Sequence, residues 1–145
     1  MHTFDQQTQF LSLLCQNKSL PIARFELRSS RDPGLCSFAL QYVYFTESHA
    51  SMEEVRKTAA ILQSMEEQGL IDCNYQLGVT VKRDYAIYED SDLYQYFCSI
   101  VEQSRQNPEF LFDTPKLKRG SVTLTARGRE AASELLGLSC LPRQR

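Results

Sequence analysis

The sequence has the length and composition of one small globular domain. It contains 145 residues, of which 42% are hydrophobic and 23% charged, and its formal net charge is −2 at pH 7. These values are close to the averages for globular proteins and exclude a disordered or collagen-like chain, and a chain of this length can bury a core without disulfides or metal. We therefore expect a single domain over residues 1–145.

The chain is expected to be cytoplasmic and to stay outside the membrane. Its apolar stretches are short, and none approaches the roughly 20 apolar residues that a membrane-spanning helix needs. Residues 1–6 lack the basic and apolar regions of a secretory signal. The cysteines are odd in number and widely spaced, so we expect neither a disulfide framework nor a metal site but mostly small buried side chains. They are Cys15, Cys36, Cys73, Cys98 and Cys140.

The chain is predicted to begin with a helix and to continue with a strand. Thr3 is followed three positions later by Gln6, which is the spacing of a capping box, and apolar residues at helical spacing predict a helix from Phe4 to Gln16. Residues Ile22–Ser29 alternate between apolar and polar side chains. This alternation predicts a half-buried strand.

The next segment allows two interpretations. Asp32-Pro33-Gly34 can open a helix whose apolar stripe runs from Leu35 to Phe45. The same residues can instead form a turn, because Phe38–Thr46 is rich in aromatic and β-branched residues and fits a strand paired with Ile22–Ser29. The choice matters because only the helix would supply the first helix of a helix-turn-helix.

The clearest helix of the sequence runs from Ser51 to Gln68. Ser51 is its N-cap, two glutamates lie in its first turn, apolar residues recur every three or four positions, and Gly69 ends it. Leu70–Tyr75 is then predicted to be a strand, and Val79–Tyr88 a second strand or an ordered loop.

The last third contains two further capped helices around a short strand. Ser91 caps a predicted helix over Asp92–Gln106. Lys118-Arg119-Gly120 is predicted to be a turn, and Ser121–Leu124 a strand. Thr125 then caps the final helix.

Two fragments of the sequence carry a recognisable pattern. They are Leu62–Ile71, which contains a helix end followed by Gly-Leu-Ile, and Val122–Arg129, which contains L-T-x-x-G-R. Together they resemble winged-helix regulators such as the MarR and PadR groups. The resemblance implies an α+β winged helix-turn-helix in which Ser51–Gln68 is the recognition helix and Thr125–Gly128 leads from the wing into a helix. The chain departs from these families between the fragments, where residues 77–115, with an inserted helix, replace the usual short wing.

A basic stretch near the C-terminus supports binding to duplex DNA. Thr114–Arg129 contains five basic residues and no acidic one, and on a wing such residues can reach phosphate oxygens. On the expected recognition helix, Arg56, Lys57 and Thr58 are the candidates for contacts to base edges. The leading hypothesis is thus a transcriptional regulator that binds DNA as a homodimer. Its expected backbone contacts are Lys116, Lys118, Arg119, Arg127 and Arg129.

The overall charge argues against DNA binding and supports a rival function. The net charge is negative, and the expected recognition helix carries more glutamates than cations. A winged-helix domain can instead serve as a protein-interaction module without DNA binding. The inserted segment supplies four tyrosines that suit a dimer or partner interface, although packing in the core explains them equally. They are Tyr85, Tyr88, Tyr94 and Tyr96.

The sequence offers little for catalysis. None of the phosphate-loop, nucleophile-elbow or H-E-x-x-H patterns occurs in it. His49 is interpreted as a polar turn residue, and the acidic residues Asp84, Glu89, Asp90 and Asp92 lack the spacing of a calcium loop. We therefore expect no enzyme activity, metal or cofactor.

Overall fold

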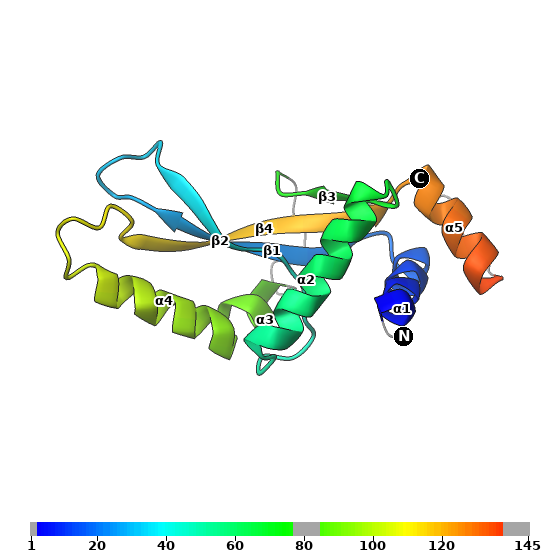
Figure 1. Cartoon of the computed structure of the whole chain (residues 1–145), viewed down its shortest axis with the longest axis horizontal. Coiled ribbons are helices and arrows are strands. Elements are labelled where there is room, and N and C mark those ends of the chain that lie inside the picture. Colours follow the sequence, from blue (N-terminus) through cyan, green and yellow to red (C-terminus); the bar gives the residue numbers. More distant parts are fainter. Residues whose placement is uncertain (1–2, 77–84, 138–145) are drawn as a thin grey trace.

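The structure is a computed structural model that describes residues 3–76 and 85–137, and it is an α+β protein (Figure 1). Within these residues no helix is both long and apolar enough to cross a membrane. In chain order the elements are α1 (Thr3–Gln16), β1 (Leu20–Arg28), β2 (Cys36–Val43), α2 (Met52–Glu67), β3 (Ile71–Asn74), α3 (Ala86–Glu89), α4 (Asp92–Ser104), β4 (Thr114–Leu124) and α5 (Ala126–Leu136).

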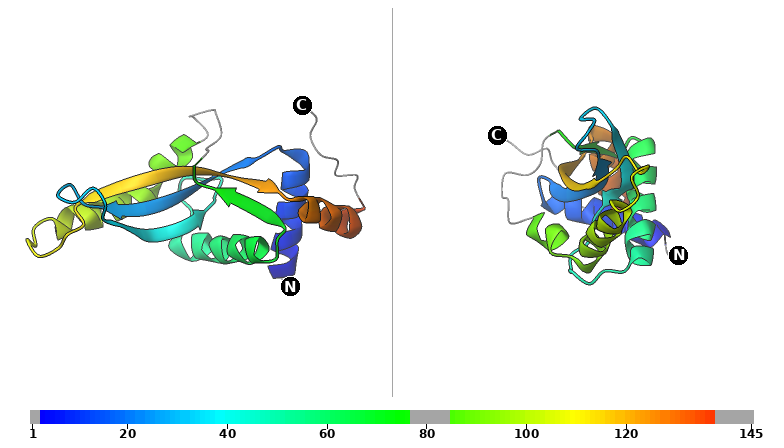
Figure 2. Two further views of the ribbon diagram at one scale, coloured as in Figure 1. Left: turned by 90° about the horizontal axis from the view of Figure 1, so that it is seen from above. Right: turned by 90° about the vertical axis from the view of Figure 1, so that its left-hand side faces the viewer.

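The strands form one antiparallel sheet in the order β2-β1-β4-β3. β1 pairs with β4 along its whole length, from Leu20 opposite Val122 to Arg28 opposite Thr114. β3 is much shorter and pairs only with the last part of β4. The ribbon of β1 and β4, with β2 beside it, therefore extends well beyond β3 (Figures 1 and 2).

Helices cover the two faces of the sheet at different places. One core lies where α1, α2 and α5 pack against a first face, around Leu11, Ile22 and Leu62. A second core lies on the opposite face, where α3, α4 and the start of α2 pack around Phe25 and Tyr85. The helices on the first face lie toward the end of the sheet next to α5, whereas α4 follows the projecting ribbon (Figure 1).

Side-chain caps fix the starts of the main helices. The Ser51 hydroxyl accepts a hydrogen bond from the Glu54 N–H at 3.1 Å, and the Glu54 carboxylate accepts one from the Ser51 N–H at 3.1 Å, which is a capping box. Ser91 caps α4 through its hydroxyl, and the Thr125 hydroxyl accepts from the Gly128 N–H at 3.0 Å at the start of α5. The predicted caps of these three helices are thus confirmed.

The entry to α5 packs closely against the exit from α2. Gly69 has a φ of 80°, which turns the chain after α2. The Thr125 hydroxyl donates to the Gly69 carbonyl at 2.6 Å, and the Thr125 N–H donates to the Leu70 carbonyl at 3.1 Å. A Cβ at Gly128 would lie 2.0 Å from the Leu70 carbonyl oxygen. The two fragments with a familiar pattern therefore form one joint, in which glycine is needed for close approach.

The helix expected over Leu35–Phe45 does not form. Cys36–Val43 is strand β2 and pairs with β1, so the alternative interpretation as a strand is confirmed. Asp32 forms a turn rather than a helix cap, because its carboxylate accepts from the Gly34 N–H at 3.1 Å and its carbonyl accepts from the Leu35 N–H at 2.9 Å. A β-hairpin therefore stands directly before α2, where a helix-turn-helix would have its first helix.

The expected wing also differs from the observed strands. The turn expected at Lys118–Gly120 is wrong, because these residues lie inside β4 and pair with Ile22–Arg24. The strand expected at Ser121–Leu124 is the last part of this longer β4. Of the strand or loop expected over residues 79–88, residues 79–84 lie outside the described residues, and Ala86–Glu89 is the short helix α3.

The other predicted elements are confirmed with small shifts at their ends. The helices expected over residues 4–16, 51–68 and 92–106 are α1, α2 and α4, and the one after Thr125 is α5. The strands expected over residues 22–29 and 70–75 are β1 and β3.

The cysteines are less buried than expected. Cys36, Cys73 and Cys98 are free thiols, of which Cys36 is exposed and the other two are half-buried. Burial raises the pKa of the Cys73 thiol to about 12. Cys15 is disulfide-bonded, contrary to the expectation of free thiols. Cys140 lies outside the described residues.

Candidate functional site

Four basic residues share one face of the projecting ribbon. Side chains alternate along a strand, so Arg24 and Arg28 of β1 point to the same face. Arg24 lies opposite Lys118 of β4, and Lys116 lies opposite Glu26, which places both lysines on that face as well. The same face carries Ile22 and, nearer to α5, the first core. We call the surface formed by Arg24, Arg28, Lys116 and Lys118 the cationic face.

Glu26 lies between Arg24 and Arg28 on β1, opposite Lys116, and binds both arginines. Its side chain is 0% exposed and forms ion pairs with Arg24 at 2.7 Å and with Arg28 at 2.6 Å. Burial raises the pKa of the Glu26 carboxyl, but hydrogen bonds from Arg28 and Arg24 and their charges outweigh it, so this pKa lies below its ordinary value. Glu26 is therefore ionised at neutral pH and offsets one of the four positive charges.

The Arg24 guanidinium is stacked between two aromatic rings. Its central carbon lies 4.0 Å from the centroid of the Phe38 ring and 4.4 Å from that of the Tyr75 ring. Phe38 of β2 lies opposite Glu26 in the sheet and keeps 47% of its surface exposed. The site therefore combines positive charge with an exposed aromatic ring.

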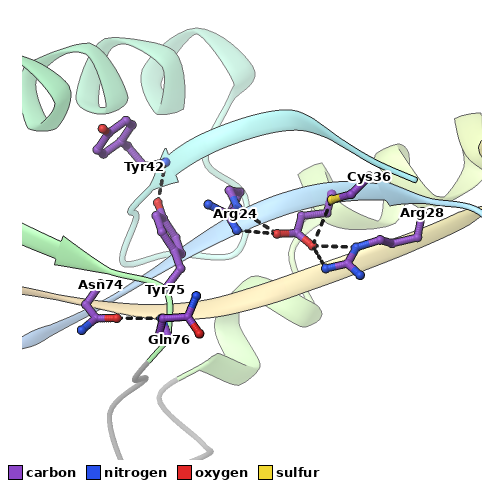
Figure 3. A network of polar contacts seen from close by, with 8 residues as sticks. Arg24, Arg28, Cys36, Tyr42, Asn74, Tyr75 and Gln76 are labelled. Atoms are coloured by element: carbon purple, nitrogen blue, oxygen red, sulfur yellow. Dashed lines mark hydrogen bonds and ion pairs between the residues drawn. The ribbon is translucent and has the colours of Figure 1, made fainter. Parts of the chain in front are cut away.

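Tyr75 reaches this stack by crossing over β4 and β1. It passes β4 at Gly120, where a Cβ would lie 2.6 Å from the Tyr75 ring. Its hydroxyl accepts a hydrogen bond from the Tyr42 N–H of β2 at 3.0 Å (Figure 3). Burial raises the pKa of Tyr75 to about 12, so this hydroxyl stays protonated at neutral pH. Tyr75 thus forms the border between the first core and the cationic face.

A second set of hydrogen bonds fixes α2 beside that border. The Tyr42 hydroxyl donates to the Glu66 carboxylate at 2.6 Å, and the Cys73 N–H donates to the same carboxylate at 3.2 Å. Glu66 is one of the glutamates that weakened the case for DNA contacts from α2. Because the Glu66 carboxylate accepts hydrogen bonds from β2 and β3, it stabilises the fold.

The basic residues expected to form one DNA-contacting surface are divided among three places. Lys116 and Lys118 belong to the cationic face. Arg119 points to the opposite face, where its guanidinium lies over the Tyr85 ring at 5.5 Å and 3.5 Å from the Glu89 carboxylate. Arg127 and Arg129 belong to α5. At about 3.3 Å per strand residue, the end of β4 lies roughly 20 Å from Lys118.

The residues expected to contact base edges do not form one surface either. Arg56 and Lys57 are exposed on α2. Thr58 is half-buried and lines a hollow of about 330 Å³ between α1 and α2, together with Phe10 and Leu13. Because consecutive helical residues are separated by about 100°, Thr58 lies far around the helix from Arg56.

Two of the four candidate interface tyrosines are core residues. Tyr85 and Tyr88 are buried, and their hydroxyls donate to the carbonyls of Gly120 at 2.6 Å and Pro21 at 2.8 Å. Their assignment to an interface is therefore corrected in favour of the alternative, core packing. Tyr94 is half-buried, and its ring makes a T-shaped contact with that of Phe25 at a centroid distance of 5.0 Å. Tyr96 is 60% exposed on α4 and remains a candidate.

His49 joins the loop before α2 to the start of α4. Its Nδ1 lies 2.7 Å from the Asp92 carboxylate, and the Asp92 N–H donates to the Ser48 carbonyl at 2.9 Å. The hydrogen bond and the charge of Asp92 raise the pKa of His49. Among the described residues, no group of three or more His, Cys, Asp or Glu side chains is placed to hold a metal ion.

Arg24 and Arg28 are functional candidates that the sequence interpretation did not include. The alternation over Ile22–Ser29 already placed them on one side of a strand. The missing information was the register, which brings this strand against Lys116 and Lys118.

Comparisons with known proteins add little to this geometry. No family model matches the chain, and no curated protein matches it. Among solved structures, it is similar to an uncharacterized protein from the hydrocarbon-degrading marine bacterium Alcanivorax borkumensis SK2, with 13% sequence identity, coverage of 91% of this chain and 84% of that chain, and a TM-score of 0.44. A likeness at this level carries no functional argument.

Proposed function

We propose that the protein binds nucleic acid and that the cationic face contacts its phosphates. The observation that carries the proposal is the separation of charge in a chain with a net charge of −2. At the positions of β1 and β4 that form this face, four cations accompany one carboxylate, and that carboxylate is buried. Binding to phosphate depends on such a local patch rather than on the total charge.

The arrangement suits the phosphate backbone because its two arginines are held at fixed positions. Arg24 is fixed by an ion pair and two rings, and Arg28 by an ion pair, so little side-chain freedom remains to be lost on binding. Lys116 and Lys118 stand roughly 7 Å apart on one strand, so each can contact a different phosphate.

A second candidate is the winged-helix regulator that binds duplex DNA as a homodimer. It is supported by the order α2, β3, β4 and α5, by the joint between Gly69 and Gly128, and by exposed Arg56 and Lys57 on α2. The hairpin of β1 and β2 before α2 argues against it. A third candidate, a protein-interaction module, is supported by exposed Tyr96 and Ile100 on α4.

The first experiment measures binding by fluorescence anisotropy with labelled oligonucleotides between about 50 and 200 mM salt. We expect binding that weakens steeply with salt. The double variant Lys116→Ala/Lys118→Ala should weaken binding at every salt concentration. It should also reduce the slope of log K against log salt by roughly 1.4 to 1.8, because each phosphate contact contributes about 0.7 to 0.9.

The matched control is Arg56→Ala/Lys57→Ala, which removes the same charge from α2. We expect it to leave binding nearly unchanged. If this control loses binding while the lysine variant of β4 keeps it, the winged-helix candidate replaces our proposal. Absence of binding by the unmodified protein at low salt overturns nucleic-acid binding altogether and leaves the interaction module.

A further inference from the structure

We infer that the nucleic acid bound at the cationic face is single-stranded and that one of its bases stacks on Phe38. This inference rests on the proposed function and specifies its ligand. Phe38 keeps 47% of its surface exposed, although a strand residue of this size normally gains stability by burial. A single exposed aromatic residue is ordinary on a protein surface, so its position among the four cations carries the argument.

The aromatic and cationic groups form a continuous stack. Tyr75, Arg24 and Phe38 follow one another at 4.4 Å and 4.0 Å between the guanidinium and the two ring centroids. The half-buried Tyr75 end is anchored by the hydrogen bond that its hydroxyl accepts from the Tyr42 N–H, and the Phe38 end is at the surface. A nucleobase is a planar aromatic group that extends such a stack, and base–aromatic stacking tolerates every base.

The phosphates of the same strand have partners within this surface. Lys116 lies opposite Glu26 on one side of β1, and Phe38 lies opposite Glu26 on the other side. With a strand spacing of about 4.8 Å, Phe38 and Lys116 are therefore roughly 10 Å apart across the sheet. A base on Phe38 and a phosphate at Lys116 or Lys118 can belong to neighbouring nucleotides of one strand.

A duplex fits this surface poorly for two reasons. Its bases are already stacked on each other, so their faces are available to Phe38 only after unstacking, which costs a few kcal/mol per step. The surface also spans three adjacent strands, about 10 Å between the outer strand axes before side chains are counted, with α4 packed behind them. The major groove is about 12 Å wide and admits one helix or a two-stranded ribbon, so this three-stranded surface is too wide to enter it.

The test compares a fluorescent oligothymidine of about 20 nucleotides with a blunt duplex of the same length, using the full chain and one low salt concentration. We expect the single strand to bind more tightly. Phe38→Leu should weaken its binding roughly 5- to 150-fold, which corresponds to the loss of one stacked base. Phe38→Tyr keeps a ring and should bind like the unmodified protein.

Tyr96→Leu is the matched control, because it removes an exposed ring from α4 at 60% exposure. We expect it to leave single-strand binding unchanged. Duplex binding as tight as single-strand binding, or a Phe38→Leu protein that binds oligothymidine normally, overturns this inference. If Lys116→Ala/Lys118→Ala still weakens binding in that case, the proposed function stands; if the unmodified protein binds neither oligonucleotide, both fail.

Discussion

At the scale of single residues, Glu26 has opposite effects on folding and on binding. Its carboxylate is buried and paired with Arg24 and Arg28. Glu26→Gln leaves both guanidinium groups without their charged partner and should lower the free energy of unfolding by roughly 1 to 3 kcal/mol. The same change removes the negative charge from the cationic face, which should strengthen its attraction for phosphate more than the loosening of the two arginines weakens binding, so oligonucleotide binding should become tighter and more dependent on salt.

Urea unfolding and anisotropy on the same preparation measure both effects. Glu102→Gln is the control, since Glu102 loses the same charge but forms only an exposed ion pair with Arg105 on α4. It should change neither stability nor binding appreciably. Weaker oligonucleotide binding by a folded Glu26→Gln protein would contradict the assignment of the cationic face.

At the scale of elements, the joint between α2 and α5 tolerates no added side chain. The Cβ of Gly128→Ala would lie 2.0 Å from the Leu70 carbonyl oxygen and 2.9 Å from the Leu124 side chain, so α5 must move away from the exit of α2. We expect a loss of about 1 to 3 kcal/mol or more in the free energy of unfolding.

Gly34→Ala provides the comparison for this change. Its Cβ meets only the Asp32 carboxylate, at an ordinary 3.6 Å, so its effect should stay within about 0.5 kcal/mol. Urea denaturation of both variants measures the difference. Equal stability of the two proteins would show that the joint can adjust without cost.

The elements also show which features of the sequence can be interpreted without a structure. α2, α4 and α5 were predictable because local caps at Ser51, Ser91 and Thr125 mark their starts. β2 was ambiguous because its apolar spacing fits both a helix and a strand. Pairing with β1 decides between them, and this pairing is a tertiary contact that propensity does not contain.

At the scale of the whole molecule, the candidate site depends on contacts between distant parts of the chain. The basic stretch around Lys116 and Lys118 was visible in the sequence, but its residues divide between two faces of the sheet and α5. Arg24 and Arg28 join the lysines only through the register of β1 and β4. The pairing of β2 with β1 and of β3 with β4 brings Arg24 between the rings of Phe38 in β2 and of Tyr75, which follows β3, and neither neighbour could be inferred from spacing.

The stability of the molecule should also respond to pH through the pair of His49 and Asp92. This pair joins the loop before α2 to the start of α4, and Asp92, with a smaller contribution from Glu47, raises the pKa of His49 in the folded protein. A raised pKa means that protonated His49 stabilises the folded state. Its contribution is complete below the unfolded pKa of about 6.5 and is lost as the pH rises through the folded pKa.

Urea unfolding of the unmodified protein and of His49→Gln at about pH 5.5 and about pH 9 tests this expectation. The unmodified protein should be the more stable of the two at the lower pH, and the difference should shrink at the higher pH. Comparing the two proteins at each pH cancels the titration of Glu26 and of the other carboxylates that both contain. Asp92→Asn should also lack the pH-dependent part of the stability by which the unmodified protein exceeds His49→Gln. A difference that is equal at both pH values would assign the contact to neutral hydrogen bonding, since only the charged imidazole gives a dependence on pH.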